Sequence, residues 1–441
     1  MTHYDVCIVG GGSGGIGAAV AAARSGLRTL LLERADRLGG TSTIGGVHNW
    51  EPTVGATGIP REVYERMLGI TNAVAITSLH AGYSPEHPYG DWRPDPSRTY
   101  DDTLRRHGLA PGTWHSVVFE PDALAAVAHA MLREAGVDVL FDATFRDVSV
   151  RDGYVERVTF ELNGERADVA PSHVIDATDG VVCVAAGAEA MVGEDARDRF
   201  DEPGAPVEPS SQRINGASLI YRIRHTGESH IEPLPTGVSP DLCRRAAHMV
   251  TYPNGDRNVN VLPVLYGAEV TAMSPQETYR EAERRIAAHW YWLQTEYGFD
   301  AWERVWTAPM LGVRESRRIV GEYVLTQNDI EAGLSRQQHA DIVAIADHAL
   351  DLHAEHGGCR ELSEPYGIPF RCLVPKGFHN LLIASRAASF SHIAASSCRL
   401  SRTIMQLGQA AGMSLRGAKR QPSGVSSLRS ETWHEGRRPS P

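Results

Sequence analysis

Short hydrophobic runs at the start of the chain enclose an alanine-rich segment. The runs at residues 4–9 and 28–34 predict two buried strands, and the alanine-rich segment from about Gly15 to Ser25 predicts a helix between them. A strand, a helix and a second strand in this order form a right-handed crossover, which places the two strands side by side and parallel. The pattern therefore predicts the beginning of an open α/β sheet.

The next long hydrophobic pattern has the period of a helix. It covers residues 120–136, where Pro121 suits the first turn and Gly136 suits the C-terminal cap. Short alternating strands are expected from residue 137 to residue 164. The apolar run at 173–180 ends in small residues and predicts a strand that enters the main sheet.

The middle of the chain mixes both kinds of pattern. Strands are expected at 215–225 and 258–267, and helices at 275–298 and 336–357. Glycine, proline and polar residues dominate three further segments, which are expected to be irregular: 39–60, 78–115 and 194–210. Near the end, residues 380–386 predict another buried parallel strand, and a last helix is expected from about Ser396 to Ser414.

Composition narrows the class of protein. The chain has 441 residues, of which 42% are hydrophobic, so more than one domain is expected. A formal net charge of −11 argues against nucleic acid and anionic membranes as partners. No apolar run reaches the roughly 18 residues of a membrane helix, and the first strand begins at Tyr4, which leaves no room for a signal peptide. The six cysteines are scattered singly, which predicts reduced thiols in a cytoplasmic protein.

A glycine-rich turn follows the first strand and opens the first helix. Gly10 suits the tight turn, Gly12 lets a pyrophosphate approach the backbone, and Gly15 lets the helix pack close to the strand. Glu33 ends the second strand, where a carboxylate accepts hydrogen bonds from ribose hydroxyls and disfavours the 2′-phosphate of NADP. These residues predict a dinucleotide site at the helix N-terminus, where free N–H groups face the phosphates. Its neighbours Ser13, Gly14 and Arg34 are included in the predicted site.

Three further segments indicate that the expected dinucleotide is FAD rather than NAD. A second glycine pair begins the loop Gly39-Gly40-Thr41-Ser42-Thr43, an Ala177-Thr178 pair follows the strand at 173–180, and a strand–helix segment covers 380–412. Together they resemble the FAD-dependent oxidoreductase family with a GGxxT flavin loop, similar to flavoproteins of the glutathione reductase and fumarate reductase type. One departure is Asp179, which stands where that family usually has a glycine.

The resemblance implies a fold and a set of cofactor contacts. The expected fold class is α/β, with a glutathione reductase-type, Rossmann-like FAD-binding domain and an inserted mixed α+β substrate domain. It implies a cofactor domain at 1–185 and 366–415, a substrate domain at 186–365 and a disordered tail at 416–441. Besides the glycine turn, the implied FAD contacts are Glu33, Arg34, Gly39, Gly40, Thr41, Thr43, Ala177, Thr178, Arg386, Arg399, Gln409 and Ala410.

Two motifs that the chain lacks limit the possible electron donors and acceptors of the flavin. The chain carries no second G-x-G-x-x-G and no redox-active cysteine pair, so electrons are expected to pass between FAD and an organic substrate, with dioxygen or an electron carrier on the other side. In flavoproteins of the succinate dehydrogenase type, a histidine shortly before this glycine pair holds the flavin covalently. Residues 39–43, shortly before Gly45 and Gly46, are only Gly, Ser and Thr, so the comparison implies non-covalent FAD. No metal site is predicted, and a homo-oligomer is left open.

The predicted catalytic residues are His392, His48 and Arg314. Each histidine lies near a predicted flavin segment and is a candidate base for a proton that leaves the substrate. The alternative for each is a hydrogen bond to a loop carbonyl. Arg314 lies in an arginine-rich segment, 314–318, that suits a substrate carboxylate; the alternative is an ion-pair lattice with neighbouring glutamates. Arg399 suits either a substrate carboxylate or the flavin.

Three functions remain open from the sequence. The first is an FAD enzyme, an oxidase or a dehydrogenase, that moves hydride from a small polar organic substrate to flavin N5. The second is a reductase of an unsaturated substrate that is loaded with electrons by a partner, with an arginine such as Arg314 as proton donor. The third is a flavin-binding sensor or scaffold without catalysis.

Overall fold

A parallel five-stranded sheet forms one layer of the computed structural model, which describes residues 3–105, 112–354 and 358–416. The strand order is β24-β11-β1-β2-β7, and each neighbouring pair is parallel. The bounds are β1 Val6–Val9, β2 Thr29–Leu32, β7 Asp138–Leu140, β11 His173–Asp176 and β24 Leu381–Ile383. The predicted strands at 4–9, 28–34, 173–180 and 380–386 are confirmed.

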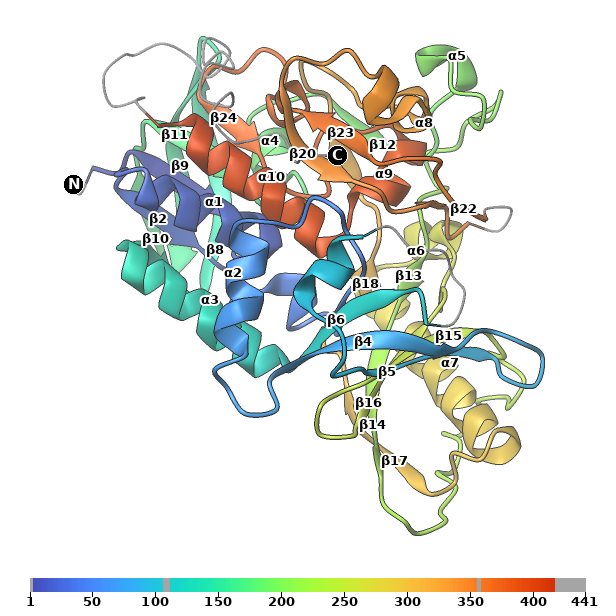
Figure 1. Ribbon diagram of the computed structural model, residues 1–441. Helices are drawn as coiled ribbons and strands as arrows, with labels where there is room; N and C mark the ends of the chain where they lie inside the picture. The colour runs from blue at the N-terminus through green and yellow to red at the C-terminus, as the bar shows by residue number, and fades with distance from the viewer. Residues whose placement is uncertain (1–2, 106–111, 355–357, 417–441) are drawn as a thin grey trace.

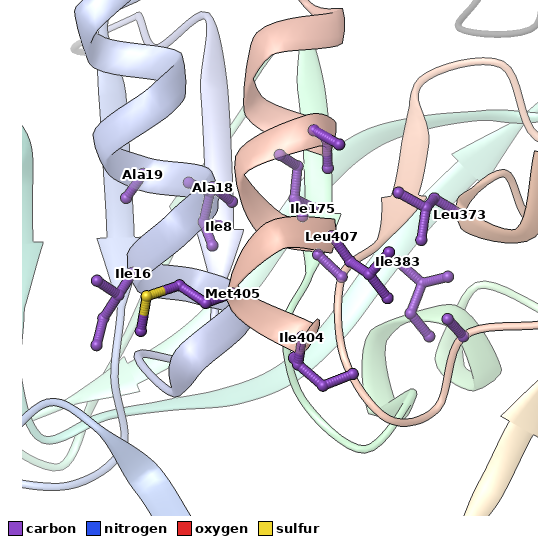
Figure 2. Packing of buried hydrophobic residues seen from close by; sticks show 14 of the residues in the cluster. Ile8, Ile16, Ala18, Ala19, Ile175, Leu373, Ile383, Ile404, Met405 and Leu407 are labelled. Carbon is purple, nitrogen blue, oxygen red and sulfur yellow. The ribbon is translucent and has the colours of Figure 1, made fainter. Parts of the chain in front are cut away.

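Helices α1 (Ser13–Arg24), α3 (Pro121–Ala135) and α10 (Ser401–Ser414) pack with this sheet, and α2 (Ile59–Met67) lies beside them. Figure 1 shows α1 in blue next to α10 in red, so two helices far apart in the sequence pack side by side on one layer. In Figure 2, Ile8, Ile175 and Ile383 of the strands lie near Leu407 of α10. All are buried hydrophobic residues of one core cluster.

A second sheet of eight strands extends away from the first layer (Figure 1). Its order is β17-β14-β16-β15-β5-β4-β6-β3. The bounds are β3 Asn49–Trp50, β4 Val74–Ala81, β5 Tyr89–Pro94, β6 His115–Phe119, β14 Ile220–His225, β15 Ala247–Thr251, β16 Arg257–Val261 and β17 Trp302–Thr307. The predicted strands at 215–225 and 258–267 are confirmed in this sheet.

The expectation of an irregular segment at 78–115 is wrong, because much of β4, β5 and the start of β6 lie there. Polar side chains in these strands bond one another across the sheet and so hide the strand pattern. Thr77 Oγ1 lies 2.6 Å from Ser116 Oγ, and Ser78 Oγ lies 2.8 Å from His115 Nδ1. These pairs supply the hydrogen bonds that buried polar groups need.

Helix α7 (Pro275–Glu296) covers the second sheet, as the pattern at 275–298 predicts. Ser274 caps its N-terminus by accepting a hydrogen bond from the backbone N–H of Glu277. Trp290 of α7 packs near Tyr221 of β14 and Phe299, and all three belong to a second core cluster. The aromatic residues of this part of the chain therefore pack the second layer.

The helix predicted at 336–357 is wrong. Helix α8 (Gln327–Arg336) ends where that prediction begins, and β20 (Ile342–Ala346) pairs antiparallel with β23 (Tyr366–Pro369). The apolar run 342–346 is compatible with either structure on its pattern alone. Pairing with β23, which is close only in the folded chain, selects the strand. Residues 355–357 of the prediction lie outside the described residues.

The single helix predicted from Ser396 to Ser414 is two helices. Helix α9 (His392–Cys398) ends before α10 begins at Ser401, because Leu400 adopts an extended backbone with φ −65° and ψ 144°. The break lets the N-terminus of α10 point in a direction different from that of α9.

The other elements are short. β8 (Ala143–Arg151), β9 (Tyr154–Leu162) and β10 (Glu165–Val169) form an antiparallel sheet, as 137–164 predicts for two of them. The remainder are α4 Val181–Ala185, α5 Arg197–Phe200, α6 Gly267–Ala272, β12 Ala190–Val192, β13 Ala217–Ser218, β18 Gly312–Val313, β19 Arg317–Ile319, β21 Leu350–Asp351, β22 Cys359–Arg360, η1 Gly40–Ser42, η2 Tyr100–Leu104 and η3 Phe370–Leu373.

The division of the chain at residues 185 and 365 stays a prediction, although the eight-stranded sheet takes strands from both sides of residue 185. Residues 417–441 of the predicted tail lie outside the described residues. Among the helices of the described residues, none is long and apolar enough to cross a membrane.

Candidate cofactor and substrate site

The glycine turn leaves open space at the N-terminus of α1. Gly12 caps this helix without a side-chain hydrogen bond, and the first turn carries no acidic residue. A Cβ added at Gly12 would meet no atom within 4 Å, whereas one added at Gly15 would stand 1.8 Å from the Gly10 carbonyl oxygen. Gly15 is therefore required for packing and Gly12 faces free space. An uncapped helix N-terminus beside free space fits a diphosphate.

The second glycine loop lies against the first. The backbone N–H of Gly39 donates to the Gly11 carbonyl oxygen at 2.8 Å, and a Cβ at Gly40 would lie 3.2 Å from Cα of Gly12. Thr43 Oγ1 donates to the Leu38 carbonyl oxygen at 2.8 Å and so braces this loop. The two loops are separated in the sequence by α1 and β2 but are adjacent in space, and together they form one continuous backbone cradle.

Glu33 stands beside this cradle. Its carboxylate accepts hydrogen bonds from the backbone N–H groups of Gly11 at 2.6 Å and Ala35 at 2.8 Å. The side chain is buried, so its position next to the glycine turn is fixed. Arg34 is exposed. A fixed carboxylate at this place is suited to ribose hydroxyls.

The other predicted cofactor residues have different surroundings. The Ala177 carbonyl oxygen would lie 2.7 Å from a Cβ at Gly10, so this segment borders the turn, and Thr178 Oγ1 donates to Asp176 at 2.5 Å. Gln409 accepts a hydrogen bond from the backbone N–H of Ile59 at 2.8 Å, which joins α10 to α2. Ser13 and Gly14 form the first turn of α1, and Ala410 is buried in α10.

A cavity of about 380 Å³ lies where the glycine loop region, the second sheet and the α9–α10 break meet. Thr41 and Trp50 line it from the cofactor side, Ile220 and His248 from the second sheet, and Ser401 from the start of α10. Its volume is in the usual range for small-molecule sites. Trp92, Trp114 and Tyr83 add aromatic surface.

Among the described residues that line this cavity, neither His48 nor His392 occurs. His48 is buried, with Nε2 2.9 Å from the Thr43 carbonyl oxygen and Nδ1 2.5 Å from Tyr252 Oη. Since Nε2 must donate to the carbonyl, Nδ1 accepts from Tyr252, and both nitrogens are occupied. Burial lowers the pKa of His48 to about 4, against the hydrogen bond to Thr43.

His392 belongs to a buried ionic network. Its Nδ1 lies 2.9 Å from Glu315 Oε2, and its backbone N–H donates to Asp195 at 2.8 Å. Arg318 lies between these two acids, 3.1 Å from Asp195 and 3.3 Å from Glu315, and is fully buried. Burial opposes the charge of Glu315, but His392 and Arg318 hold its pKa below the ordinary value. This part of the arginine-rich segment therefore forms the ion-pair lattice, through Glu315.

Three of the predicted arginines do line the cavity: Arg314, Arg386 and Arg399. Arg386 pairs with Asp179 at 2.8 Å and Arg399 pairs with Asp351 at 3.2 Å. Arg314 binds only neutral acceptors within the described residues, the Gly216 carbonyl oxygen at 3.1 Å and Ser218 Oγ at 3.0 Å. The segment after β18, which pairs with β13, and the C-terminal segment thus bring these three guanidinium groups to one site.

Two histidine–carboxylate pairs in the cavity wall were not found from the sequence. His348 Nε2 lies 2.8 Å from Glu51, and His353 Nε2 lies 2.6 Å from Asp351. Burial would raise the pKa of Glu51, but His348 lowers it to about 2. Burial would lower the pKa of His348, but Glu51 raises it above its ordinary value. The signal for Asp351 and His353 was their spacing of two residues, which places both on one face of an extended segment. His348 falls outside this alternation.

The described residues contain no group of three or more His, Cys, Asp or Glu side chains placed to hold a metal ion. All six cysteines are free, and Cys359 is the exposed one.

The fold and the cradle define a dinucleotide-binding α/β protein. Residues 5–432 match the family model described as FAD dependent oxidoreductase, and the chain belongs to this family. Its cofactor is FAD, and it is an enzyme of the oxidoreductase class.

Solved structures show how widely this fold is shared. A triple mutant of the flavin-dependent brominase Bmp2 is 13% identical with a TM-score of 0.51, and the match covers 97% of this chain and 83% of that one. A geranylgeranyl bacteriochlorophyll reductase-like protein from Thermoplasma acidophilum is 16% identical with a TM-score of 0.46, over 94% of this chain and 77% of that one. At these identities the brominase likeness concerns the fold alone, and no activity is inferred from either protein.

Proposed function

We propose that the protein moves hydride from a small polar organic substrate in the cavity to N5 of FAD. The observation that carries this proposal is the cavity itself, whose wall is shared between the glycine loop region and the second sheet. Bound FAD supplies the two-electron acceptor. The chain supplies a place for the substrate and groups that orient it.

The charges in the wall support a polar substrate. Arg314, Arg399 and the two histidine–carboxylate pairs lie around a volume that is also lined by aromatic rings. Aromatic surface excludes water, and a few charged groups fix the orientation of a ligand. Exclusion of water strengthens each of these polar contacts.

A base is needed for the proton that leaves an adjacent O–H or N–H of the substrate. His392 and His48 remain predicted bases from the sequence, but reaching the cavity requires a rearrangement of their present hydrogen bonds. The histidines that already line the cavity, His348 and His353, could reach a substrate without such a rearrangement.

FAD is proposed to be held without a covalent bond, by the cradle at Gly12 and Gly40 and by Glu33. Acid precipitation should release all of the flavin into the supernatant. Flavin that stays with the precipitated protein would contradict this part of the proposal.

The experiment is anaerobic mixing of the holoenzyme with a panel of small polar compounds while the flavin absorbance is followed. Bleaching identifies an electron donor, and admission of air then separates an oxidase from a dehydrogenase. If no compound bleaches the flavin but chemically reduced holoenzyme transfers electrons to an unsaturated compound, the partner-loaded reductase is the correct function. If neither occurs, a non-catalytic role remains.

A pair of matched variants tests the cavity. Ala246 lines it, whereas Ala268 of α6 is exposed elsewhere. Ala246→Trp should raise KM for the donor at least tenfold with FAD still bound, and Ala268→Trp should leave KM unchanged. Equal KM values in both variants would place the substrate elsewhere.

A further inference from the structure

We propose that the substrate is a carboxylate with a hydroxyl or amino group on the neighbouring carbon, that Arg314 binds the carboxylate, and that His353 takes the proton. This inference rests on the function proposed above and names the substrate class of the same cavity. It is carried by two residues that both line the cavity and both contact Gly216, Arg314 through its guanidinium and His353 through its backbone carbonyl.

Arg314 is the first of these side chains. Its two terminal nitrogens donate to the Gly216 carbonyl oxygen and to Ser218 Oγ, both neutral, while Arg386 and Arg399 in the same wall each have a carboxylate partner. Burial and the nearby charge of Arg399 lower the pKa of Arg314 to about 9. Asp351 and Glu51 act on this guanidinium from a distance, but within the described residues no carboxylate is paired with it directly. A carboxylate is the ligand that its planar donors fit.

His353 is the second side chain. Its Nε2 donates to Asp351 at 2.6 Å, and Asp351 also accepts from Arg399 at 3.2 Å. The ring orientation is therefore fixed by a carboxylate that is itself held in place. Within the described residues Nδ1 of His353 has no hydrogen-bond partner, so this nitrogen is the one available to accept a proton.

Gly216 contacts both residues. Its backbone N–H donates to the His353 backbone carbonyl oxygen at 2.9 Å, and its own carbonyl oxygen accepts from the Arg314 guanidinium. Both residues line the same cavity, and the charge of Arg314 acts on the His353 ring. A substrate that contacts both needs an anionic group and an ionisable O–H or N–H close to it, and 2-hydroxy and 2-amino carboxylates carry both.

The two groups are also coupled electrostatically. Burial and the charge of Arg314 lower the pKa of His353 to about 4, against the attraction of Asp351. A carboxylate bound to Arg314 cancels part of this repulsion and raises the pKa of His353. The substrate thus makes its own base stronger when it binds. The other titratable groups in the cavity wall are Arg386, Arg399, Asp347, Asp351, Glu361, the Glu51–His348 pair, His248, Tyr83 and Cys359.

The proposed step balances. The C–H bond of the substrate breaks, and its electron pair and hydrogen pass as hydride to N5 of bound FAD. The neighbouring O–H or N–H proton passes to Nδ1 of His353, and the C–O or C–N bond becomes a double bond. The product is a 2-oxo or 2-imino carboxylate, FAD is reduced by two electrons, and His353 carries one proton.

The first test measures binding alone, with holoenzyme and inert ligands followed by the change in flavin absorbance. Propanoate and propanamide differ only in charge and hydrogen bonding at one end. We expect propanoate to bind at least tenfold more tightly, and Arg314→Gln to reduce this preference below threefold. Arg314→Lys should keep part of it. The control Arg146→Gln, which changes an exposed arginine paired with Glu161, should keep all of it.

The second test measures flavin reduction by a panel of 2-hydroxy and 2-amino carboxylates and the matching amides. His353→Gln should bind propanoate as tightly as the unaltered protein and slow reduction about 100-fold, in the range known for general bases. The control His225→Gln changes an exposed histidine of β14 and should have no effect. Thermal melting of each variant separates loss of fold from loss of function.

The outcomes distinguish the two proposals. If a neutral alcohol or amine reduces the flavin and propanoate binds no better than propanamide, the substrate class is wrong and the proposed function stands. If nothing reduces the flavin, the proposed function fails. NMR titration of His353 then still decides the inference, because propanoate should raise the pKa of His353 in the unaltered protein and not in Arg314→Gln. An unchanged pKa would overturn it.

Discussion

Gly408 of α10 packs directly against Gly14 of α1, so closely that a Cβ at Gly408 would stand 2.0 Å from the Gly14 carbonyl oxygen. Gly412 repeats the contact one turn later, where a Cβ would stand 2.3 Å from the Ala18 carbonyl oxygen. Since Gly14 belongs to the first turn of α1, the last helix of the described residues also fixes the backbone that is proposed to face the diphosphate of FAD.

Gly408→Ala should therefore destabilise the protein. The added methyl group has no free volume between two helix backbones, and such overpacking costs about 1–3 kcal/mol. Urea denaturation followed by circular dichroism measures the loss. Gly82→Ala is the control, because a Cβ there meets no atom within 4 Å. Equal midpoints for the two variants would contradict the close helix contact.

Gly12→Val should abolish FAD binding without unfolding the chain. The backbone of Gly12, with φ −73° and ψ −170°, suits valine, and the space around it is free of protein atoms. The new side chain then occupies the place that the diphosphate needs. The flavin content of the purified variant and its circular dichroism spectrum check this. A variant that keeps its flavin would place the diphosphate elsewhere.

Arg318→Met should be among the most destabilising substitutions in the described chain. It leaves Asp195 and Glu315 buried without their shared cation, and breaking a buried ion pair costs about 3–5 kcal/mol. Arg317→Met is the control, because this neighbouring side chain is partly exposed and has no ion pair within the described residues. The comparison needs only denaturation curves at pH 7. Similar losses in both variants would show that the network contributes little.

Acid should weaken the fold through buried histidines. Burial lowers the pKa of His289 to about 4, while the same group in the unfolded chain titrates near 6.5. Above pH 6.5 both states are neutral at this site and it has no effect. As the pH falls from 6.5 to 4 the unfolded state binds the proton first, so stability falls by about 1.4 kcal/mol per pH unit.

The variant His289→Gln isolates this contribution, because it removes one titrating group that does not line the cavity. Between pH 6 and 4.5, the free energy of unfolding should depend less steeply on pH in this variant than in the unaltered chain. The difference in slope should correspond to close to one bound proton. His225→Gln, at an exposed site, should keep the original slope. An unchanged slope in His289→Gln would mean that this histidine is not held neutral.

The first strand, helix and strand could be predicted because each has its own local pattern and its own end signals. Gly136, for example, adopts a left-handed conformation with φ 79° where the sequence places a C-cap. The strands at 74–119 could not, because their polar side chains are satisfied by partners on other strands, such as Thr77 by Ser116. The strand at 342–346 depends in the same way on β23.

The cofactor cradle was predictable for the same reason, because its glycines lie close together in two short segments of the sequence. The cavity was not. Arg314 and His353 both contact Gly216, and the three residues lie on segments that no local pattern joins. On the helix predicted at 336–357, the side chains of Asp351 and His353 would point in different directions. The wrong secondary structure therefore kept these two residues out of the predicted site.

The eight-stranded sheet has a consequence for how the chain reaches its native state. Its only parallel pair joins β5 and β15, with Tyr89 opposite Ala247, so the sheet cannot be completed until residues far apart in sequence have met. Contacts of such long sequence separation slow folding, because loop closure precedes the gain from pairing. During synthesis one edge of β5 must wait for β15, more than a hundred residues further along the chain, and in that interval this unpaired edge is exposed to aggregation.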